Sequence, residues 1–180
     1  MRCFISLRIS EDVSKYLFNL QRTLRKELNA KIRWVPKSQL HITLKFLGSI
    51  NNDKLKGTKE RLELVKYNLF SLNLDKIGIF PSFNDPKILW VGINDKKHVL
   101  NLQKRIDEAL LDIFPQEQRF NAHITFGRIK LIKDRKRFSD ALNGVKIYNK
   151  TFEVNEFALI ESMLKKDGPV YRTLNVYKLL

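Results

Sequence analysis

A chain of 180 residues is long enough for one well-buried domain and too short for two ordinary independent domains. Hydrophobic residues make up 43% of it, yet no stretch approaches the roughly 18 to 20 apolar residues of a membrane-spanning helix, which argues against an integral membrane protein. Cys3 is the only cysteine, which excludes an internal disulfide and a cysteine-based zinc site.

The chain is strongly basic. Lysine and arginine outnumber the acids by 34 to 19, which gives a formal charge of +15. Such a potential attracts polyanions by releasing their counterions, so nucleic acid is the expected partner. The N-terminal segment lacks the pattern of a secretory signal, and we expect a cytoplasmic monomer without membrane attachment.

Alternating apolar residues predict strands, and apolar residues three or four positions apart predict helices. Between these segments, Gly, Pro and Asp mark the turns. In chain order we expect a strand at 2–9, a helix at 11–28, strands at 32–35 and 40–47, a helix at 51–66, strands at 70–80 and 87–93, a helix at 97–114, a strand at 120–130, a short helix at 133–142, and a closing hairpin of 151–164 and 170–180 around Asp167 and Gly168.

A weak internal repeat is visible in this order of elements. A strand, a helix and a strand with a histidine motif occur at 2–47 and again at 87–130, and the two motifs are 82 residues apart. Such duplication predicts two similar lobes. We therefore expect an α+β, bilobal, duplicated fold in a single domain of residues 1–180, in which two antiparallel sheets line a central cleft and helices pack on the outer faces.

Two of the three histidines stand in the same short pattern. The two copies read His41-Ile42-Thr43-Leu44 and His123-Ile124-Thr125-Phe126. On a strand, residues i and i+2 point to the same face, so each histidine projects together with its threonine. Ile42, Leu44 and Phe46 are then expected in the core, as are Ile124 and Phe126. The alternative is that each histidine merely satisfies a hydrogen bond at a sheet edge, where threonine is common because it favours strands.

Two imidazoles and two hydroxyls suit the cleavage of a phosphoester. With an unperturbed pKa near 6.5, one imidazole can accept a proton from water while the other donates one to the departing oxygen. The threonine hydroxyls can donate to the non-bridging oxygens, where negative charge is held. This chemistry requires no metal, and neither a nucleotide-binding Gly-rich loop nor any other cofactor signature is present.

The paired motifs resemble those of the two-histidine (2H) phosphoesterases. Within that superfamily the chain is most similar to the RNA 2′,3′-cyclic phosphodiesterases of bacteria and archaea, also known as 2′-5′ RNA ligases. The similarity runs from the strand at 3–9 to the segment at 168–171. Its most specific parts are Trp34-Val35-Pro36, the block at 41–48, and the block at 123–128.

This resemblance implies a function for each matching residue. His41 would be the proton donor to the leaving 3′ oxygen, and His123 the proton acceptor that activates water, although the two labels can be exchanged. Thr43 and Thr125 would hold the phosphate with the help of Arg128. The implied partner is RNA with a 2′,3′-cyclic phosphate end, with tRNA fragments among the candidates, and the implied product is a 2′-phosphate.

Further residues are predicted near the site with less support from the pattern. Arg128 shares the face of Thr125 only if a bulge or a strand end occurs at Gly127. Lys45 is expected on the face of His41, where it would bind substrate. Basic residues that can follow the RNA backbone, or simply form a solvated face, are Lys130, Lys133, Arg135, Lys136, Arg137, Lys165 and Lys166, and aromatic residues that can stack on a base, or belong to the core, are Phe83, Trp90 and Tyr171.

Two other functions are compatible with the sequence. The same site can join RNA through a 2′-5′ bond or cleave such bonds, because one set of groups catalyses a reaction in both directions. A protein of another class, an RNA-binding module without turnover, is favoured by the charge but does not explain the paired motifs.

Overall fold

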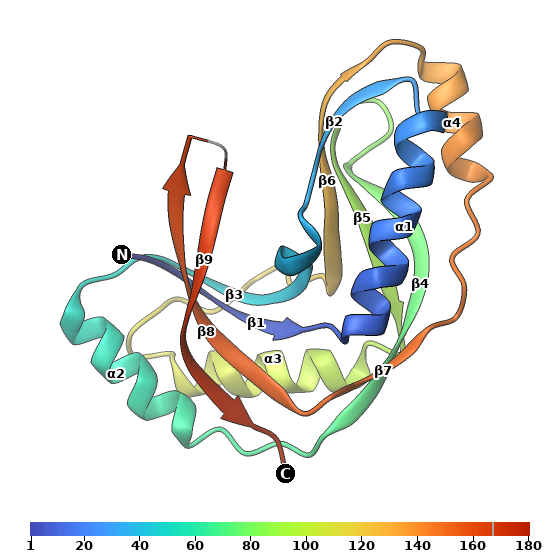
Figure 1. Ribbon diagram of the computed structural model, residues 1–180. Coiled ribbons are helices and arrows are strands. Elements are labelled where there is room, and N and C mark those ends of the chain that lie inside the picture. The colour runs from blue at the N-terminus through green and yellow to red at the C-terminus, as the bar shows by residue number, and fades with distance from the viewer. Residues whose placement is uncertain (167) are drawn as a thin grey trace.

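Nine strands, four α-helices and a short 3₁₀ helix make up the described residues, 1–166 and 168–180, of the computed structural model (Figure 1). Asp167, in the predicted turn of the last hairpin, lies outside the described residues. The elements are β1 (Arg2–Arg8), α1 (Glu11–Glu27), β2 (Ala30–Trp34), η1 (Lys37–Gln39), β3 (His41–Ser49), α2 (Asn52–Glu63), β4 (Phe70–Pro81), β5 (Pro86–Asn94), α3 (Lys97–Ala109), β6 (His123–Ile132), α4 (Arg135–Asn143), β7 (Thr151–Val154), β8 (Glu156–Lys165) and β9 (Gly168–Lys178).

The boundaries of α1 show how the sequence fixes an element locally. The Ser10 hydroxyl accepts a hydrogen bond from the backbone N–H of Val13 at 3.3 Å, which satisfies one of the free donors of the first turn. Val13, Leu17 and Leu24 lie along one buried face of the helix, at helical spacing. The predicted first helix is confirmed.

The strands form one antiparallel sheet in the order β7-β4-β5-β6-β3-β1-β8-β9, with β2 also paired to β6. We call β2 and β4–β6, with α1 and α4, the upper lobe, and β1, β3, β8 and β9, with α2 and α3, the lower lobe (Figure 1). We assign β7 to the upper lobe because it pairs with β4. Between β3 and β6 the register is the single pair Ile42 and Ile124. The predicted α+β bilobal fold is confirmed, and its two expected sheets are joined edge to edge at the histidine motifs.

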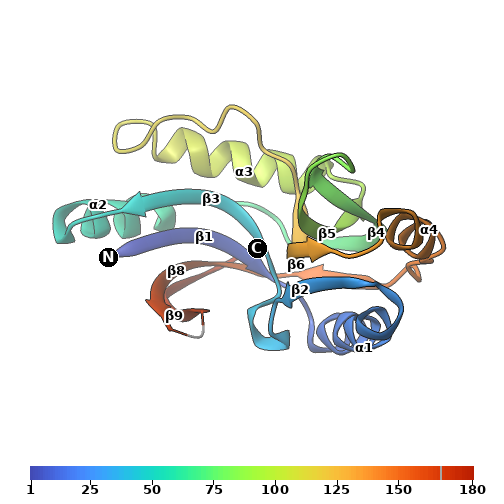
Figure 2. The ribbon, with the colours of Figure 1, turned by 90° about the horizontal axis from the view of Figure 1, so that it is seen from above.

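In each half of the repeat, the helix that follows the first strand packs on the opposite lobe (Figures 1 and 2). Helix α1 follows β1 but packs on the upper lobe, and α3 follows β5 but packs on the lower lobe. Gln21 of α1 donates to the carbonyl of Phe126 in β6, and Asp107 of α3 pairs with Lys45 of β3. The main cluster of buried apolar residues includes members of both lobes. Each half of the repeat therefore supplies the helix that covers the other half's motif strand.

The expected strand 120–130 begins at His123 and the expected helix 51–66 ends at Glu63, and two other predicted elements differ more in extent. The expected strand 151–164 is divided at Asn155 into β7, which pairs with β4 in the upper lobe, and β8, which pairs with β1 and β9 in the lower lobe. The expected helix 97–114 ends at Ala109, and a turn follows it. No helix in the described part of the chain has the length and apolar content needed to cross a membrane.

Candidate active site

The two histidine motifs lie on neighbouring strands and face the same way. Ile42 and Ile124 are paired across β3 and β6, and both side chains are fully buried. Their neighbours in sequence therefore point to the opposite face, which we call the site face and which carries His41, Thr43, His123 and Thr125, all of them half-buried. Because the strands are antiparallel, the two histidines are diagonal neighbours, which places their Cα atoms about 7 to 8 Å apart.

The same kind of hydrogen bond orients both imidazoles. His41 Nδ1 lies 2.7 Å from the carbonyl oxygen of Gln39, and His123 Nδ1 lies 2.7 Å from that of Asn121. A carbonyl only accepts, so Nδ1 carries the hydrogen in each ring and Nε2 is the nitrogen available for proton transfer. His41 Nε2 lies 3.0 Å from Thr43 Oγ1, which donates to the neutral ring.

Both histidines favour the neutral form. Burial lowers the pKa of His41 below its ordinary value, the bond to Gln39 offsets part of this, and the charge of His123 lowers the pKa further. Burial also lowers the pKa of His123, against the bond to Asn121, and the charge of Lys96 adds to the decrease. A bound anion between the rings would favour the protonated form of one of them.

Each motif strand carries a β-bulge at the same position of its motif. In β3, Lys45 pairs with Ile5 and Thr43 with Ser6, which leaves Leu44 as the extra residue. In β6, Gly127 pairs with Leu89 and Thr125 with Trp90, which leaves Phe126 as the extra residue. Beyond each bulge the alternation of side chains is reversed.

The bulge in β3 corrects two predictions. Lys45 was expected beside His41, but it is only 3% exposed and forms an ion pair with Asp107 on the core side of the sheet. Its ammonium also donates to the carbonyl of Pro115 at 2.7 Å. Phe46 was expected in the core, but it is 69% exposed and its ring lies 6.3 Å from that of Phe4. Lys45 therefore does not contribute to the site face.

The sequence required a bulge near Gly127 for Arg128 to share the face of Thr125, and β6 has such a bulge at Phe126. Arg128 is exposed and pairs across the sheet with Ile88, on the same face as Thr125. The pKa of the Tyr171 hydroxyl is raised by burial, and the charge of Arg128 acts against this increase. The Tyr171 ring in turn lies 5.5 Å from that of His41. Arg128 therefore lies on the site face, beyond the bulge that follows Thr125.

Comparison with known families agrees with this arrangement. The family model described as LigT like Phosphoesterase matches residues 7–90 and matches again at 91–171. This chain belongs to the LigT-like phosphoesterase family. The double match also corresponds to the internal repeat, because each matched segment contains one histidine motif.

Relatives of this LigT-like phosphoesterase cover its whole length. A protein of Methanocaldococcus jannaschii named RNA 2′,3′-cyclic phosphodiesterase is 31% identical over 97% of this chain and 98% of its own. A protein of Archaeoglobus fulgidus with the same name is 29% identical over 99% of this chain and 100% of its own. A crystal structure of a Thermus thermophilus protein superposes with a TM-score of 0.84 at 25% identity, covering 99% of this chain and 97% of that one.

Aromatic rings fix the planes of both imidazoles in this LigT-like phosphoesterase. Phe4 stacks on His41 with ring centroids 5.0 Å apart and an interplanar angle of 29°. Phe80 meets His123 edge-on at 5.1 Å and 86°. Neither phenylalanine was predicted as a site residue, because their places beside the histidines depend on which strands pair. Trp90 and Tyr171, predicted as stacking residues, also contact the histidine rings.

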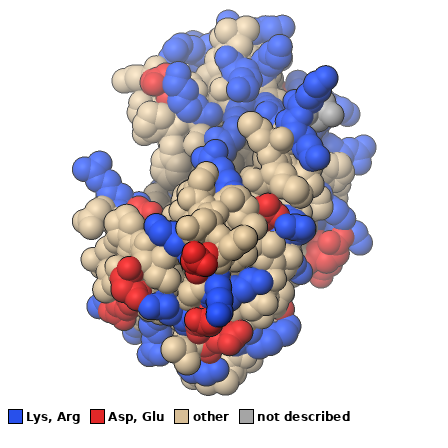
Figure 3. All heavy atoms as spheres, turned by 90° about the vertical axis from the view of Figure 1, so that its left-hand side faces the viewer, with Lys and Arg blue, Asp and Glu red and all other residues tan. Residues whose placement is uncertain are grey.

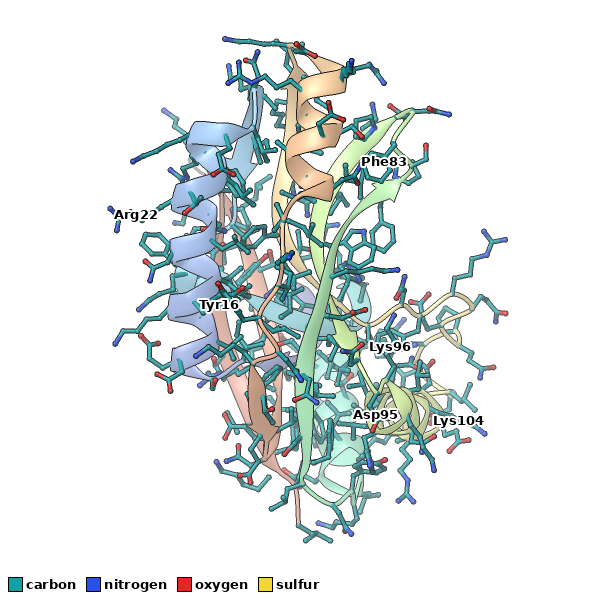
Figure 4. The ribbon with its side chains drawn as sticks, turned by 90° about the vertical axis from the view of Figure 1, so that its right-hand side faces the viewer. Tyr16, Arg22, Phe83, Asp95, Lys96 and Lys104 are labelled. Carbon is teal, nitrogen blue, oxygen red and sulfur yellow. The ribbon has the colours of Figure 1, made fainter. Side chains whose placement is uncertain are left out.

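Lys96 is a third site residue that the sequence did not indicate, after Phe4 and Phe80. It lies in the turn after β5 (Figure 4), and its ammonium donates to the side-chain oxygen of Asn121 at 3.3 Å. The backbone carbonyl of Asn121 is the group that orients His123. Lys96 therefore places a positive charge beside the loop that leads into β6.

The other predicted binding residues of this LigT-like phosphoesterase lie in turns, at strand ends and at the start of α4. Phe83, in the turn between β4 and β5, is 50% exposed (Figure 4). Lys165 and Lys166 are exposed at the end of the β8–β9 hairpin. The predicted basic segment occupies the distal end of β6 and the start of α4, where all its members are exposed, namely Lys130, Lys133, Arg135, Lys136 and Arg137.

Proposed function

We propose that this protein hydrolyses the 2′,3′-cyclic phosphate at an RNA end to a 2′-phosphomonoester, by proton transfer between the substrate and two histidines without a metal. The observation that carries the proposal is the matched pair of imidazoles on adjacent strands, each with Nδ1 bonded to a backbone carbonyl, so that Nε2 is the nitrogen that can exchange a proton. Relatives named for this activity support the choice of substrate.

The reaction balances with these groups alone. The oxygen of a water molecule forms a bond to phosphorus while Nε2 of His123 takes its proton, and the bond between phosphorus and the 3′ oxygen breaks as Nε2–H of His41 protonates that oxygen. The products are a 2′-phosphate and a 3′-hydroxyl. One histidine ends with a proton gained and the other with a proton lost, and exchange with solvent restores both.

The surroundings of each Nε2 favour this assignment of roles. His123 Nε2 has no hydrogen-bond partner among the residues that the structure describes, which leaves it open to water. Protonated His41 Nε2 would be held by the Thr43 oxygen until the leaving oxygen develops charge. Thr43, Thr125 and Arg128 are proposed to hold the non-bridging oxygens, whose negative charge must be stabilised in the transition state.

The test is to incubate the purified protein, in EDTA, with a short RNA that ends in a 2′,3′-cyclic phosphate, and to resolve the products. We expect conversion to the 2′-phosphate. A 3′-phosphate as the product would contradict the proposed bond cleavage. A longer RNA, joined through a 2′-5′ bond when a 5′-hydroxyl fragment is added, would indicate that ligation is the preferred direction, and binding without product would indicate an RNA-binding module.

A further inference from the structure

Most of the excess positive charge lies on two segments of the chain that meet at the distal end of the upper lobe, where Ala30 pairs with Ile132. Residues 22–37 and 128–137 contain twelve Lys and Arg but only two acids, which is +10 of the chain's +15. In Figure 3 the basic side chains cover much of the upper lobe, whereas basic and acidic side chains are interspersed over the lower lobe. The excess charge is thus a local feature of the surface.

Two hollows flank the end of β6 in this region. The larger, of about 540 Å³, is lined by Glu27 and by five basic residues from α1, β2 and the segment after β6, namely Arg25, Lys26, Lys31, Lys133 and Arg137. None of these five forms an ion pair with a residue that the structure describes. The smaller hollow, of about 280 Å³, is lined in part by Phe83, Arg135 and Lys136. We call these eight aromatic and basic residues the basic tip.

The acids of this region do not neutralise it. Asp134 accepts a hydrogen bond from the backbone N–H of Arg137 at 3.0 Å and thereby caps α4. Glu27 is the one acidic residue among those that line the larger hollow. The larger hollow has five cations around one carboxylate, and the smaller one has two cations with the Phe83 ring, which is 50% exposed. Together they form a surface suited to phosphates and a stacked base.

β6 connects the basic tip to the site face. The strand begins at His123 and passes Arg128 and Lys130, both exposed, before it reaches Leu131 at the larger hollow. Eight residues of strand span about 26 Å at roughly 3.3 Å per residue. At about 3.4 Å per stacked nucleotide, this length corresponds to roughly eight nucleotides of one RNA strand.

We propose that the basic tip binds the backbone of the RNA substrate several nucleotides away from its cyclic phosphate end. This inference rests on the proposed function and makes it more specific, because a mononucleotide in the site cannot reach the tip. The substrate class is an RNA strand of about eight nucleotides or more. An acidic protein is a weaker fit, since the row of cations continues along β6 to the site where the phosphate would react.

The test compares two variants of equal charge change on two substrates. The tip variant is Lys31→Gln with Lys133→Gln and Arg137→Gln. The control replaces three exposed lysines of the lower lobe, as Lys56→Gln with Lys66→Gln and Lys104→Gln. The substrates are a dinucleotide and a 20-nucleotide RNA, both ending in a 2′,3′-cyclic phosphate, and KM and kcat are measured from 50 to 300 mM salt.

For the tip variant we expect the KM of the long RNA to rise about tenfold or more, with kcat unchanged and the KM of the dinucleotide unaffected. The slope of log KM against log salt should fall by about 2, from roughly 0.7 for each lost phosphate contact. Phe83→Ala should raise the KM of the long RNA about fivefold or more, with little dependence on salt. Equal changes for both substrates, or equal changes in the control, would overturn the proposal.

Failure of the proposed function can be separated from failure of this inference. A fluorescent 20-nucleotide RNA with an ordinary 3′-hydroxyl reports binding by anisotropy without any turnover. If the wild type turns over neither substrate, a selective loss of this binding in the tip variant still supports the basic tip. If both substrates are hydrolysed and neither KM nor binding responds to the tip variant, the tip proposal is refuted and the proposed function stands.

Discussion

Each of the two histidines is oriented by the backbone carbonyl two residues before it. Gln39 and Asn121 supply these carbonyls, and both histidines are the first residues of their strands. The sequence predicted which imidazoles and hydroxyls share a face, because strand alternation is a local rule. The sequence did not predict that Phe4 and Phe80 contact the histidine rings, since a contact between residues far apart in the chain depends on strand pairing.

The pKa values of both histidines are lowered, and this predicts that kcat/KM falls at a pH below the ordinary histidine value. The proton donor must be charged in the free enzyme, and its pKa lies below the ordinary 6.5 because of burial. We therefore expect kcat/KM for a cyclic-phosphate RNA to fall as pH rises through a value below 6.5. In the bound state the substrate anion raises this pKa, so kcat should fall only at a higher pH. A kcat/KM that stays level up to pH 8 would contradict the account.

Thr125→Val tests the proposed hold on the non-bridging oxygens. Valine keeps the shape of threonine but cannot donate, so we expect kcat to fall about 10²-fold, as for the loss of one oxyanion donor. Thr151→Val, on β7 away from the motifs, is the matched control and should leave kcat unchanged. Steady-state rates with circular dichroism as a check on folding are the measurement. Equal rates in both variants would remove Thr125 from the mechanism.

At the scale of elements, each bulge is held by a polar side chain from the helix beneath it. Gln21 of α1 donates to the carbonyl oxygens of Val35 at 2.9 Å and Phe126 at 3.1 Å. Beneath the bulge of β3, Gln103 of α3 donates to Asp107 at 2.7 Å. Gln21 and Gln103 are 82 residues apart, the same interval as the histidines. The two glutamines thus occupy matching positions in the repeat, but Gln21 contacts the bulge of β6 directly, whereas Gln103 reaches β3 only through Asp107, the partner of Lys45.

The ion pair between Lys45 and Asp107 predicts a large effect on stability. Both side chains are almost fully buried, and Asp107 also accepts from the backbone N–H of Glu117 at 3.0 Å, in the loop that leads to β6. Lys45→Met would leave a buried carboxylate unpaired, so we expect the free energy of unfolding to fall by about 3 to 5 kcal/mol.

Urea denaturation measures this loss, and the double variant Lys45→Met with Asp107→Leu is its control. Because the double variant removes both charges, it should recover most of the lost stability. A single variant that loses less than about 1 kcal/mol would show that the pair is not needed to hold β3.

For the whole molecule, two features join the two halves. Helices α1 and α3 each cover the motif strand of the other half, and residues 151–165 are divided between the lobes. β7 belongs to the upper lobe and β8 to the lower, so the chain crosses between them at Asn155. The bilobal class was predictable from the repeat. The single joined sheet and the exchanged helices were not, because the packing partner of an amphipathic face is not encoded in its periodicity.

This joining predicts that both lobes unfold in one transition. Trp34 and Trp90 both lie in the upper lobe, so tryptophan fluorescence reports on that lobe. Cys3, 1% exposed in β1, reports on the lower lobe through its reactivity with a thiol reagent. We expect the two probes to give the same midpoint in urea. Two separate midpoints would show that the lobes are independent domains.

The central claim is that His41 and His123 together perform the proton transfers. The most direct measurement is the single-turnover rate of cyclic phosphate opening, in EDTA, for His41→Ala, His123→Ala and the double variant. We predict that each single change lowers the rate by about 10² to 10⁴ and that the double variant is little worse than the slower single one, because the pair acts as a unit. Substantial turnover in the double variant would contradict the account.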